Sequence, residues 1–535
     1  MSRVRRQPAA VFDPVEHRRI LRLMSGLLLA LFATSLSSTI LTTALPTVVG
    51  QLGGQDQLAW IAASQLLATT VSTPLWGKFS DIHGRKRLFQ LSLLVFVAGS
   101  LVAGAAQDIT ELVAARAIQG LGTGGTLALT QAILADVISP RQRGRYTGYL
   151  GASFALATVI GPLAGGFLVD APGLGWRWCF FAGLPLVAAA MVVVQSTLEA
   201  DRPRPRLAVD RLGALLVSAA IVVAVLLLTL GGTSIPWLSP WSAALAVLAL
   251  VLVAAAAGQE RRAVDPILPP RIVRQRTFRL AGGGLLISGA VMYSALTFIP
   301  LYLQIVKDRA PTVAGLLTLP MVVMMVGSSA TVGRLVSAWG RWKVYPVAGM
   351  AVSALGLLLV SRLDAGSSLV LAGVDMALIG AGVGMTAQVL ILACQNEAQQ
   401  RDLGVVSATT SFLRSLGGAL GVALLGGVLS VQLASTVPAL LRERHLSGGS
   451  GLNTSHLVGT PAAVAHLPAG VRSAVVDGLA QSLDVVFLVT VPLALLGLLA
   501  VSRLRERPLR TTRFEVEEME DQPEMADGLA LEATA

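Results

Sequence analysis

Charge is scarce in this chain: only 13% of its 535 residues are Asp, Glu, Lys or Arg, whereas 54% are hydrophobic. Soluble globular domains carry about a quarter charged residues, so this composition excludes a water-soluble fold. Cysteine is scarcer still. Cys179 and Cys394 lie far apart in the sequence, which indicates neither a disulfide framework nor a metal site.

Several functional classes lack their residue patterns here. The chain has a net charge of +11, but no basic stretch is interleaved with aromatic residues, so nucleic-acid binding is not expected. No Gly-Lys-Ser/Thr sequence ends a phosphate-binding loop, which argues against ATP as a direct energy source. No Ser/His/Asp, Cys/His or metal-ligand set gathers either. We therefore expect neither an enzyme nor a bound cofactor or metal.

Long apolar runs are abundant, for example residues 212–230 and 241–257. A helix needs about 20 such residues to cross the hydrocarbon core of a bilayer. The pattern therefore predicts an all-α membrane protein with the lipid bilayer as its surroundings. The fourteen predicted spans are residues 22–45, 58–76, 88–106, 112–135, 146–169, 178–198, 212–231, 240–258, 279–304, 312–335, 344–362, 367–395, 404–432 and 482–502.

The distribution of basic residues predicts the orientation of these spans. Most of the 41 lysines and arginines fall in alternate connecting segments, and few fall in the segments between them. Basic connecting segments remain in the cytoplasm by the positive-inside rule. We therefore expect a multi-pass protein of the cell (inner) membrane with both termini cytoplasmic.

Two internal repeats divide the chain into related halves. Residues 77–87 (GKFSDIHGRKR) recur in part as residues 333–343 (GRLVSAWGRWK), each between the second and third helix of its half. The glycines at 120, 122 and 124 are echoed at 380, 382 and 384, each set in a fourth helix. Such repeats are typical of transporters with a substrate site between two halves.

The predicted organisation is two pseudo-symmetric six-helix halves with two inserted helices between them. Its parts are a cytoplasmic N-terminal tail (1–20), an N-terminal six-helix half (21–200), a linker with inserted helices seven and eight (201–262), a C-terminal six-helix half (263–505) with an extracytoplasmic loop at about 433–481, and a cytoplasmic C-terminal tail (506–535).

Three motifs carry a resemblance to a known family. Residues 77–87, 116–120 (RAIQG) and 161–166 (GPLAGG) resemble the loop, fourth-helix and antiporter motifs of the major facilitator superfamily. With fourteen spans, the chain looks like the EmrB/QacA branch of drug:proton antiporters over roughly residues 20 to 505. The resemblance implies a monomeric unit that exports amphipathic or cationic small molecules by alternating access, with the proton gradient as energy source.

Other functions remain open on the same scaffold. The chain could transport one specific metabolite, lipid or self-made antibiotic, or it could be a sensor that transports nothing. Protection of a host against several unrelated compounds would favour the multidrug exporter.

The first loop motif predicts a gate latch. Its glycines permit a tight turn, and Asp81 can pair with arginines or accept hydrogen bonds from a helix N-terminus. The alternative is a solvated basic loop that only satisfies topology. Ser337 replaces Asp81 in the second copy, so a weaker latch is expected there. The candidate gate residues are Gly77, Asp81, Gly84, Arg85, Lys86, Gly333, Gly340 and Arg341.

Ionisable residues inside spans are candidates for the transport pathway, because each is costly in lipid without a cavity or a partner. Arg116 and Asp375 lie at nearly equivalent places in the two halves, and Gln119 belongs to the same motif as Arg116. The resemblance implies that both helices line a central cavity, where Asp375 could exchange a proton. The alternative is a fixed ion pair that orders helices. For Arg414 we expect either contact with substrate or a packing or capping role.

The first helix departs from the family pattern. The branch commonly has Asp and Asn there, whereas this sequence has Ser37, Ser38 and Thr42, whose hydroxyls bond either substrate or a neighbouring helix. The usual proton site is therefore missing. In the fifth helix we expect an antiporter-type bend, or else a generic packing face, at Gly161, Pro162, Gly165 and Gly166.

Overall fold

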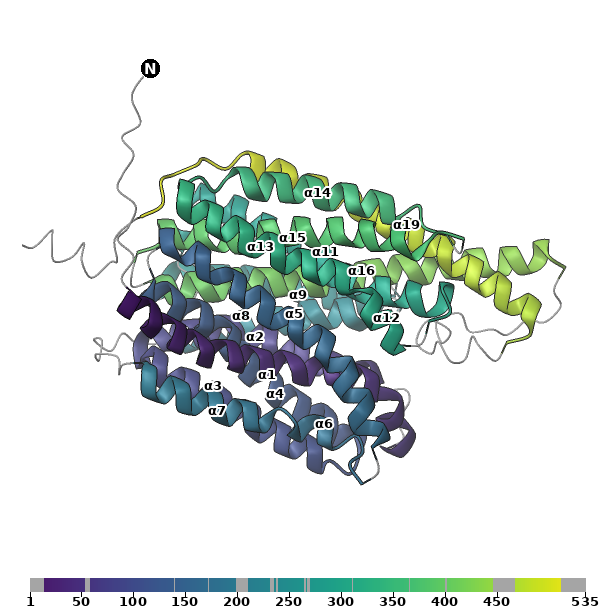
Figure 1. The fold of residues 1–535 in the computed structure, drawn as a ribbon, viewed down its shortest axis with the longest axis horizontal. Coiled ribbons are helices and arrows are strands. Elements are labelled where there is room, and N and C mark those ends of the chain that lie inside the picture. The colour runs from purple at the N-terminus through teal and green to yellow at the C-terminus, as the bar shows by residue number, and fades with distance from the viewer. Residues whose placement is uncertain are drawn as a thin grey trace, which may run out of the picture.

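The molecule is a bundle of helices that run roughly along its longest axis (Figure 1). This computed structural model describes residues 14–52, 58–138, 140–171, 173–198, 210–230, 235–236, 239–263, 266, 270–309, 311–364, 366–399, 402–445 and 467–510. The first residues of α1 and the last residues of α19 lie at the same end of the bundle, which we call the terminal end, opposite the far end.

Seven helical elements form the N-terminal half, and two more form the insertion. The half contains α1 (Pro14–Leu52), α2 (Leu58–His83), α3 (Arg85–Ala105), α4 (Ile109–Val137), α5 (Pro140–Asp170), α6 (Trp178–Phe181) and α7 (Leu184–Thr197). The insertion contains α8 (Arg211–Leu230) and α9 (Pro240–Arg262).

The C-terminal half follows a short helix, α10 (Pro270–Val273). Its elements are α11 (Arg276–Leu301), the π-helix η2 (Tyr302–Val306), α12 (Pro311–Leu317), α13 (Leu319–Trp339), α14 (Val344–Val360), α15 (Leu369–Glu397), α16 (Leu403–Glu443) and α19 (Ala469–Ser502). Each predicted span thus overlaps one described helix, or two consecutive elements in the case of α6 and α7, α11 and η2, and α12 and α13.

Ten of the described helical segments are long and apolar enough to cross a membrane, and α8 and α14 contain shorter apolar stretches. The helices α2 and α4 are joined to each other by polar groups. Thr69 Oγ1 donates to the Gly120 carbonyl at 3.1 Å, and Trp76 Nε1 donates to the Leu121 carbonyl at 2.8 Å. These polar groups find partners inside the protein, as a spanning helix requires.

The predicted repeat of glycines is confirmed by how the fourth helices pack. A side chain at Gly120 or Gly124 in α4 would strike α2, and one at Gly122 would strike α3. In the other half, Gly380 and its neighbours in α15 repeat this arrangement: the outer glycines face α13 and the middle one faces α14. Small residues at these positions let the helices approach closely in both halves.

The two halves meet along a surface that we call the seam. There α2 packs against α16, and α5 packs against α13. The inserted helix α8 contacts both α2 and α16, so it covers the seam on one side. Its Val217 and Ile221 pack with Phe412 of α16 in one apolar cluster.

The prediction of a loop over 433–481 is wrong at both of its ends. At 1.5 Å per residue, the 41 residues of α16 extend about 60 Å, twice the roughly 30 Å of the hydrocarbon core. Leu433, Val437 and Leu441 recur every four residues and pack against Val471 and Val475 of α19. This apolar face makes the two helices extend together beyond the bundle (Figure 1).

Candidate functional site

The first loop motif joins the two halves at the terminal end. Arg85 Nη1 lies 2.5 Å from Asp81 Oδ1, and Arg85 Nε lies 2.7 Å from Asp136 Oδ2 at the end of α4. The backbone N–H of Val405, in the first turn of α16, donates to Asp81 Oδ2 at 3.2 Å. Asp81 therefore links α2 and α3 of one half to the N-terminus of a helix in the other half, where the helix dipole favours a negative charge.

Close backbone contact accompanies this link. A side chain at Gly77 would overlap Ala408 and would lie 2.8 Å from the Gly404 carbonyl oxygen. Gly84, with φ of 95°, lies in the left-handed region and makes the turn into α3. Lys86 points elsewhere and donates to the Gln195 carbonyl of α7 at 2.8 Å. The geometry is that of the predicted latch, and its role in gating stays a prediction.

The second copy of the motif differs from the first in its turn and in its partners. Gly340, with φ of 70°, ends α13, and α14 begins only at Val344, whereas Gly84 is directly followed by α3. Gly333 is buried and Arg341 is exposed. The N–H of Trp342 donates to Glu506 Oε1 at 2.8 Å, and its indole Nε1 donates to the Arg507 carbonyl at 2.9 Å. This copy therefore holds the chain's own C-terminal segment.

Residues 503–510 form a strap across the terminal end of the C-terminal half. Asn396, at the end of α15, donates to the Pro508 carbonyl at 3.0 Å and accepts from the Arg510 N–H at 3.0 Å. Leu509 is buried in the same apolar cluster as Trp342. Residues 506–510, predicted as part of a tail, thus pack on the bundle. The rest of that predicted tail lies outside the described residues.

Arg116 lies in a polar cluster inside the N-terminal half. Its Nε donates to the Ile61 carbonyl at 3.3 Å and its Nη1 donates to Gln119 Oε1 at 3.1 Å. Gln119 Nε2 in turn donates to Ser100 at 2.8 Å and to Ser37 at 3.4 Å. The cluster thus connects α1, α2, α3 and α4, and all of the acceptors are uncharged.

The other first-helix candidates are less connected. Ser38 Oγ accepts from Gln65 Nε2 of α2 at 2.9 Å, so this hydroxyl forms a helix–helix bond. The side chain of Thr42 lies outside the described part of the structure.

Asp375 is buried in α15, about two turns after the helix begins at Leu369. No hydrogen bond or ion pair reaches its carboxylate from the described residues. Arg116 and Asp375 are not joined to one another. The alternative of a fixed ion pair that orders helices stays a prediction, and the described residues contain no such pair at Asp375. Arg414 is half-buried in α16, and its Nε is buried without a hydrogen-bonding partner in the described structure.

The fifth-helix motif packs against the first helix. Thr39 Oγ1 of α1 donates to the Ala157 carbonyl at 2.8 Å, and a side chain at Gly161 would overlap Thr39. Pro162 also lies 3.9 Å from the position that a side chain at Gly315 would occupy in α12, across the seam. The buried Gly165 and half-buried Gly166 follow one turn later. The motif therefore touches both halves.

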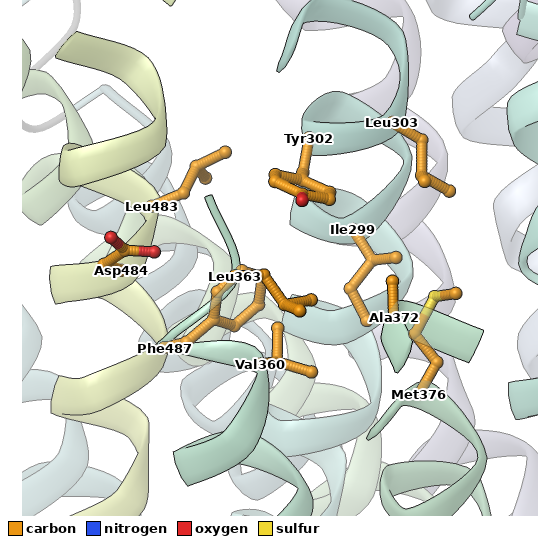
Figure 2. A pocket seen from close by; sticks show the side chains of 10 residues that line it. All are labelled: Ile299, Tyr302, Leu303, Val360, Leu363, Ala372, Met376, Leu483, Asp484 and Phe487. Carbon is orange, nitrogen blue, oxygen red and sulfur yellow. The ribbon is translucent and has the colours of Figure 1, made fainter. Parts of the chain in front are cut away.

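Asp484 is an acidic residue that was not among the candidates predicted from the sequence. The predicted span began at residue 482 and so placed Asp484 at a membrane boundary, but α19 begins at Ala469 and Asp484 lies near its middle. The four-residue spacing of apolar residues upstream, from Val471 through Val475 to Leu479, was the available signal. Asp484 lines a hollow between α11, η2, α14, α15 and α19 (Figure 2).

Comparisons with known proteins agree with this architecture. An uncharacterized MFS-type transporter of Mycobacterium tuberculosis is 35% identical over 93% of this chain and 71% of its own length. The multidrug transporter protein MdtP of Bacillus subtilis is 33% identical over 77% of this chain and 75% of its own length. The human organic anion transporter MFSD10 (TETRAN) shares the fold, with a TM-score of 0.56 and 17% identity over 90% of this chain and all of that one.

The sequence pattern of the Major Facilitator Superfamily matches residues 27–422 of this chain. This match spans most of both halves, including the first loop motif, the fourth-helix motif and the seam. The chain is therefore a multi-pass membrane transporter for small molecules, not an enzyme, and it belongs to the Major Facilitator Superfamily.

Proposed function

We propose that this protein exports amphipathic drugs or other toxic small molecules across the cell membrane by alternating access. The names of its relatives support export, since one of them is a multidrug transporter. The two halves form separate packed units that meet along the seam, which is the construction that rocking of one half against the other requires.

The observation that carries the proposal is the contact of Asp81 with α16. The Asp81 carboxylate pairs with Arg85 of its own half and holds the terminal end of the seam closed through the Val405 N–H of the other half. Contacts of this size are worth a few kcal/mol, so substrate or proton binding can outweigh them. A latch that is strong enough to hold one state and weak enough to release it suits alternating access.

The terminal end is cytoplasmic in this proposal. Lys86, Arg85 and Arg341 lie there with the basic starts of α1 and α11, whereas few basic residues lie at the far end. Each chain contains both halves of the pathway, so the transport unit is a monomer in the cell (inner) membrane.

The proton gradient supplies the energy in this proposal, and Asp375 carries the proton. Its carboxylate is buried in α15 and has no partner within the described residues, so a proton is a ready way to neutralise it. The first helix has Ser37 in place of the family's usual acid, and Ser37 is already bonded to Gln119.

Dye transport in inverted membrane vesicles tests this function. With an imposed inside-acid gradient, wild type should accumulate several unrelated amphipathic dyes, and collapse of the gradient should stop it. Asp375→Asn should lose gradient-driven transport, while the exposed control Asp108→Asn should keep it. Unchanged transport in Asp375→Asn would remove the proton role of Asp375, and no flux of any dye would contradict export.

A transporter of one metabolite, lipid or self-made antibiotic is the second candidate. It would protect a pump-deficient host against a single compound, whereas the proposed exporter protects against several unrelated ones. A sensor would show neither protection nor flux.

A further inference from the structure

The strap carries arginines on its outer side. Leu504 and Leu509 are buried in an apolar cluster of the C-terminal half, whereas Arg503, Arg505 and Arg507 are exposed. The two leucines hold the strap against the bundle, so the exposed arginines lie on the side that faces away from it. Figure 1 shows this segment in yellow, where it leaves α19 at the terminal end.

The start of α11 adds further arginines beside the strap. Arg276 and Arg279 are exposed on either side of the buried Thr277. Thr277 Oγ1 donates to Glu397 Oε1 at 2.9 Å, and Arg507 Nε of the strap lies 3.4 Å from the same oxygen. The start of α11 and the strap therefore meet at Glu397, although they lie far apart in the sequence.

We call the four exposed residues Arg276, Arg279, Arg503 and Arg505 the arginine cluster. No hydrogen bond or ion pair reaches their side chains from the described residues. Like charges that are gathered on one surface repel one another, and a negative charge from outside the chain lowers that cost. The cluster therefore favours an anionic partner.

The nearby carboxylates do not neutralise the arginine cluster. Glu397 pairs with Arg507, which is not a member of the cluster. Glu506 follows Arg505 in the strap, and its Oε1 accepts from the backbone N–H groups of residues 342 and 343. Even when the charge of Glu506 is counted against the four arginines, the surface keeps a positive excess.

The arginine cluster lies where the head groups of a bilayer lie. The apolar segment of α11 that can span a membrane begins at Arg276, and that of α19 ends at Ser502, directly before Arg503. Val273 and Trp339, at the same end of the bundle, are 40% and 69% exposed, and exposed tryptophan is typical of a membrane–water interface. Groups of about four to eight basic residues beside a spanning helix attract anionic lipids.

We propose that the arginine cluster binds the head groups of anionic phospholipids, with the lipid phosphate between the strap and the start of α11. Guanidinium groups suit this ligand, because they donate two parallel hydrogen bonds to phosphate oxygens. A bound lipid would join the strap to α11 on the outer side, where Glu397 already joins them beneath. The inference concerns the membrane-facing surface and does not depend on which molecules the transporter exports.

Quenching of a fluorescent label at position 273 by brominated lipids tests this surface. The label is attached to the full chain through Val273→Cys, because the native Cys179 and Cys394 are buried. In phosphatidylcholine bilayers, brominated phosphatidylglycerol should quench the label at least about threefold more effectively than brominated phosphatidylcholine at the same mole fraction. Equal quenching by the two lipids would overturn the proposal.

Neutralising the arginine cluster should abolish this preference. The variant combines Arg276→Gln, Arg279→Gln, Arg503→Gln and Arg505→Gln, so that no positive charge remains in the cluster. Replacing the same four residues by lysine keeps the charge and should keep most of the preference. An undiminished preference in the glutamine variant would overturn the proposal.

The matched control removes the same charge elsewhere at the terminal end. Arg18 and Arg22 of α1 and Arg261 and Arg262 of α9 are exposed, and no ion pair reaches them from the described residues. Changing these four to glutamine should leave the preference at position 273 intact. A loss as large as in the cluster variant would contradict a local site, because only the overall charge of the protein would then matter.

Two further outcomes would assign the surface to another occupant. If inorganic phosphate removes the preference and sodium chloride of equal ionic strength does not, the surface binds free anions and the proposal is wrong. Residues 515–520 contain four glutamates and lie outside the described residues. If wild type shows no preference and changing these glutamates to glutamine creates one, the chain's own acidic segment, and not lipid, occupies the cluster.

Discussion

The two loop motifs share their glycines and an arginine, yet they bind different partners. The first, through Asp81, reaches across the seam to the N-terminus of α16. The second has Ser337 at that position, and its Oγ donates to Gly333 within its own helix, while Trp342 holds the strap through Glu506. The first loop therefore joins the two halves through Asp81, whereas Trp342 of the second loop secures the C-terminal strap.

This difference predicts that the contacts of the first loop change during transport, whereas those of the second loop do not. The hydrogen bond from the Val405 N–H to Asp81 can break and reform as the halves rock, because Val405 belongs to the other half. The hydrogen bonds that Trp342 and Lys343 of the second loop make to Glu506 and Arg507 lie within the C-terminal half, so they can persist in every state. Four substitutions test this division, from the largest expected effect to the smallest.

Gly77→Val should have the largest effect. The added side chain would overlap Ala408 and crowd the Gly404 carbonyl, so the seam could not close at the terminal end. We expect dye efflux in vesicles to fall more than about tenfold, since displaced packing of this kind costs about 1–3 kcal/mol. The control is Gly327→Val in α13, where no atom lies within 4 Å of the added carbon. Equal losses in both variants would contradict the close-approach argument.

Asp81→Asn should weaken the latch without breaking the fold. Arg85 keeps Asp136, so we expect a loss of about 1–3 kcal/mol from the closed state. A cysteine at Ser329 of α13, which is buried and lies 4.0 Å from the side-chain position at Gly151 of α5 across the seam, should then react several times faster with a maleimide. The native Cys179 and Cys394 are buried and supply the background rate. A reaction rate that Asp81→Asn leaves unchanged would mean that the carboxylate does not hold the seam.

Glu506→Ala should lower stability rather than change gating. It removes the acceptor for the Trp342 and Lys343 N–H groups, which we expect to cost about 1–2 kcal/mol in thermal unfolding. Glu506→Gln retains an acceptor oxygen and should lose less. Efflux per folded molecule should stay within about twofold of wild type, and a larger loss would show that the strap takes part in transport.

Arg341→Ala should have the smallest effect. Arg341 is exposed, and no hydrogen bond or ion pair reaches its side chain from the described residues, so the free energy of unfolding should stay within about 0.5 kcal/mol of wild type and dye efflux should be unchanged. An effect as large as that of Asp81→Asn would erase the distinction between the two loops.

Much of the fold could be predicted because lipid imposes strong local rules. Apolar runs marked the spans, and the glycines of α4 and α15 marked equivalent packing positions. The extension of α16 and α19 was missed because its apolar residues recur only every fourth position, between polar ones, and hydropathy averages them away. The extension is visible only when Leu433 and Val437 are paired with Val471.

The candidate site was predicted less completely, since side-chain partners depend on three-dimensional packing. Asp81 was expected to meet an arginine or a helix N-terminus, and it meets both, Arg85 nearby and Val405 far away in the sequence. The partner of Trp342 could not be predicted, because Glu506 lies in a segment that reads as a polar tail. Asp484 was misplaced for a simpler reason, the wrong start of its helix.

The most direct test of the gating account is the distance between spin labels at positions 83 and 399, measured by pulsed electron paramagnetic resonance after His83 and Gln399 are replaced by cysteine. Both side chains are exposed at the terminal end, one on each side of the seam. Asp81→Asn should shift the distance distribution toward longer values, whereas Glu506→Ala should leave it unchanged. A distribution that Asp81→Asn does not move, or that Glu506→Ala moves equally, would contradict the claim that the first loop, and not the strap at the second loop, holds the terminal end of the seam closed.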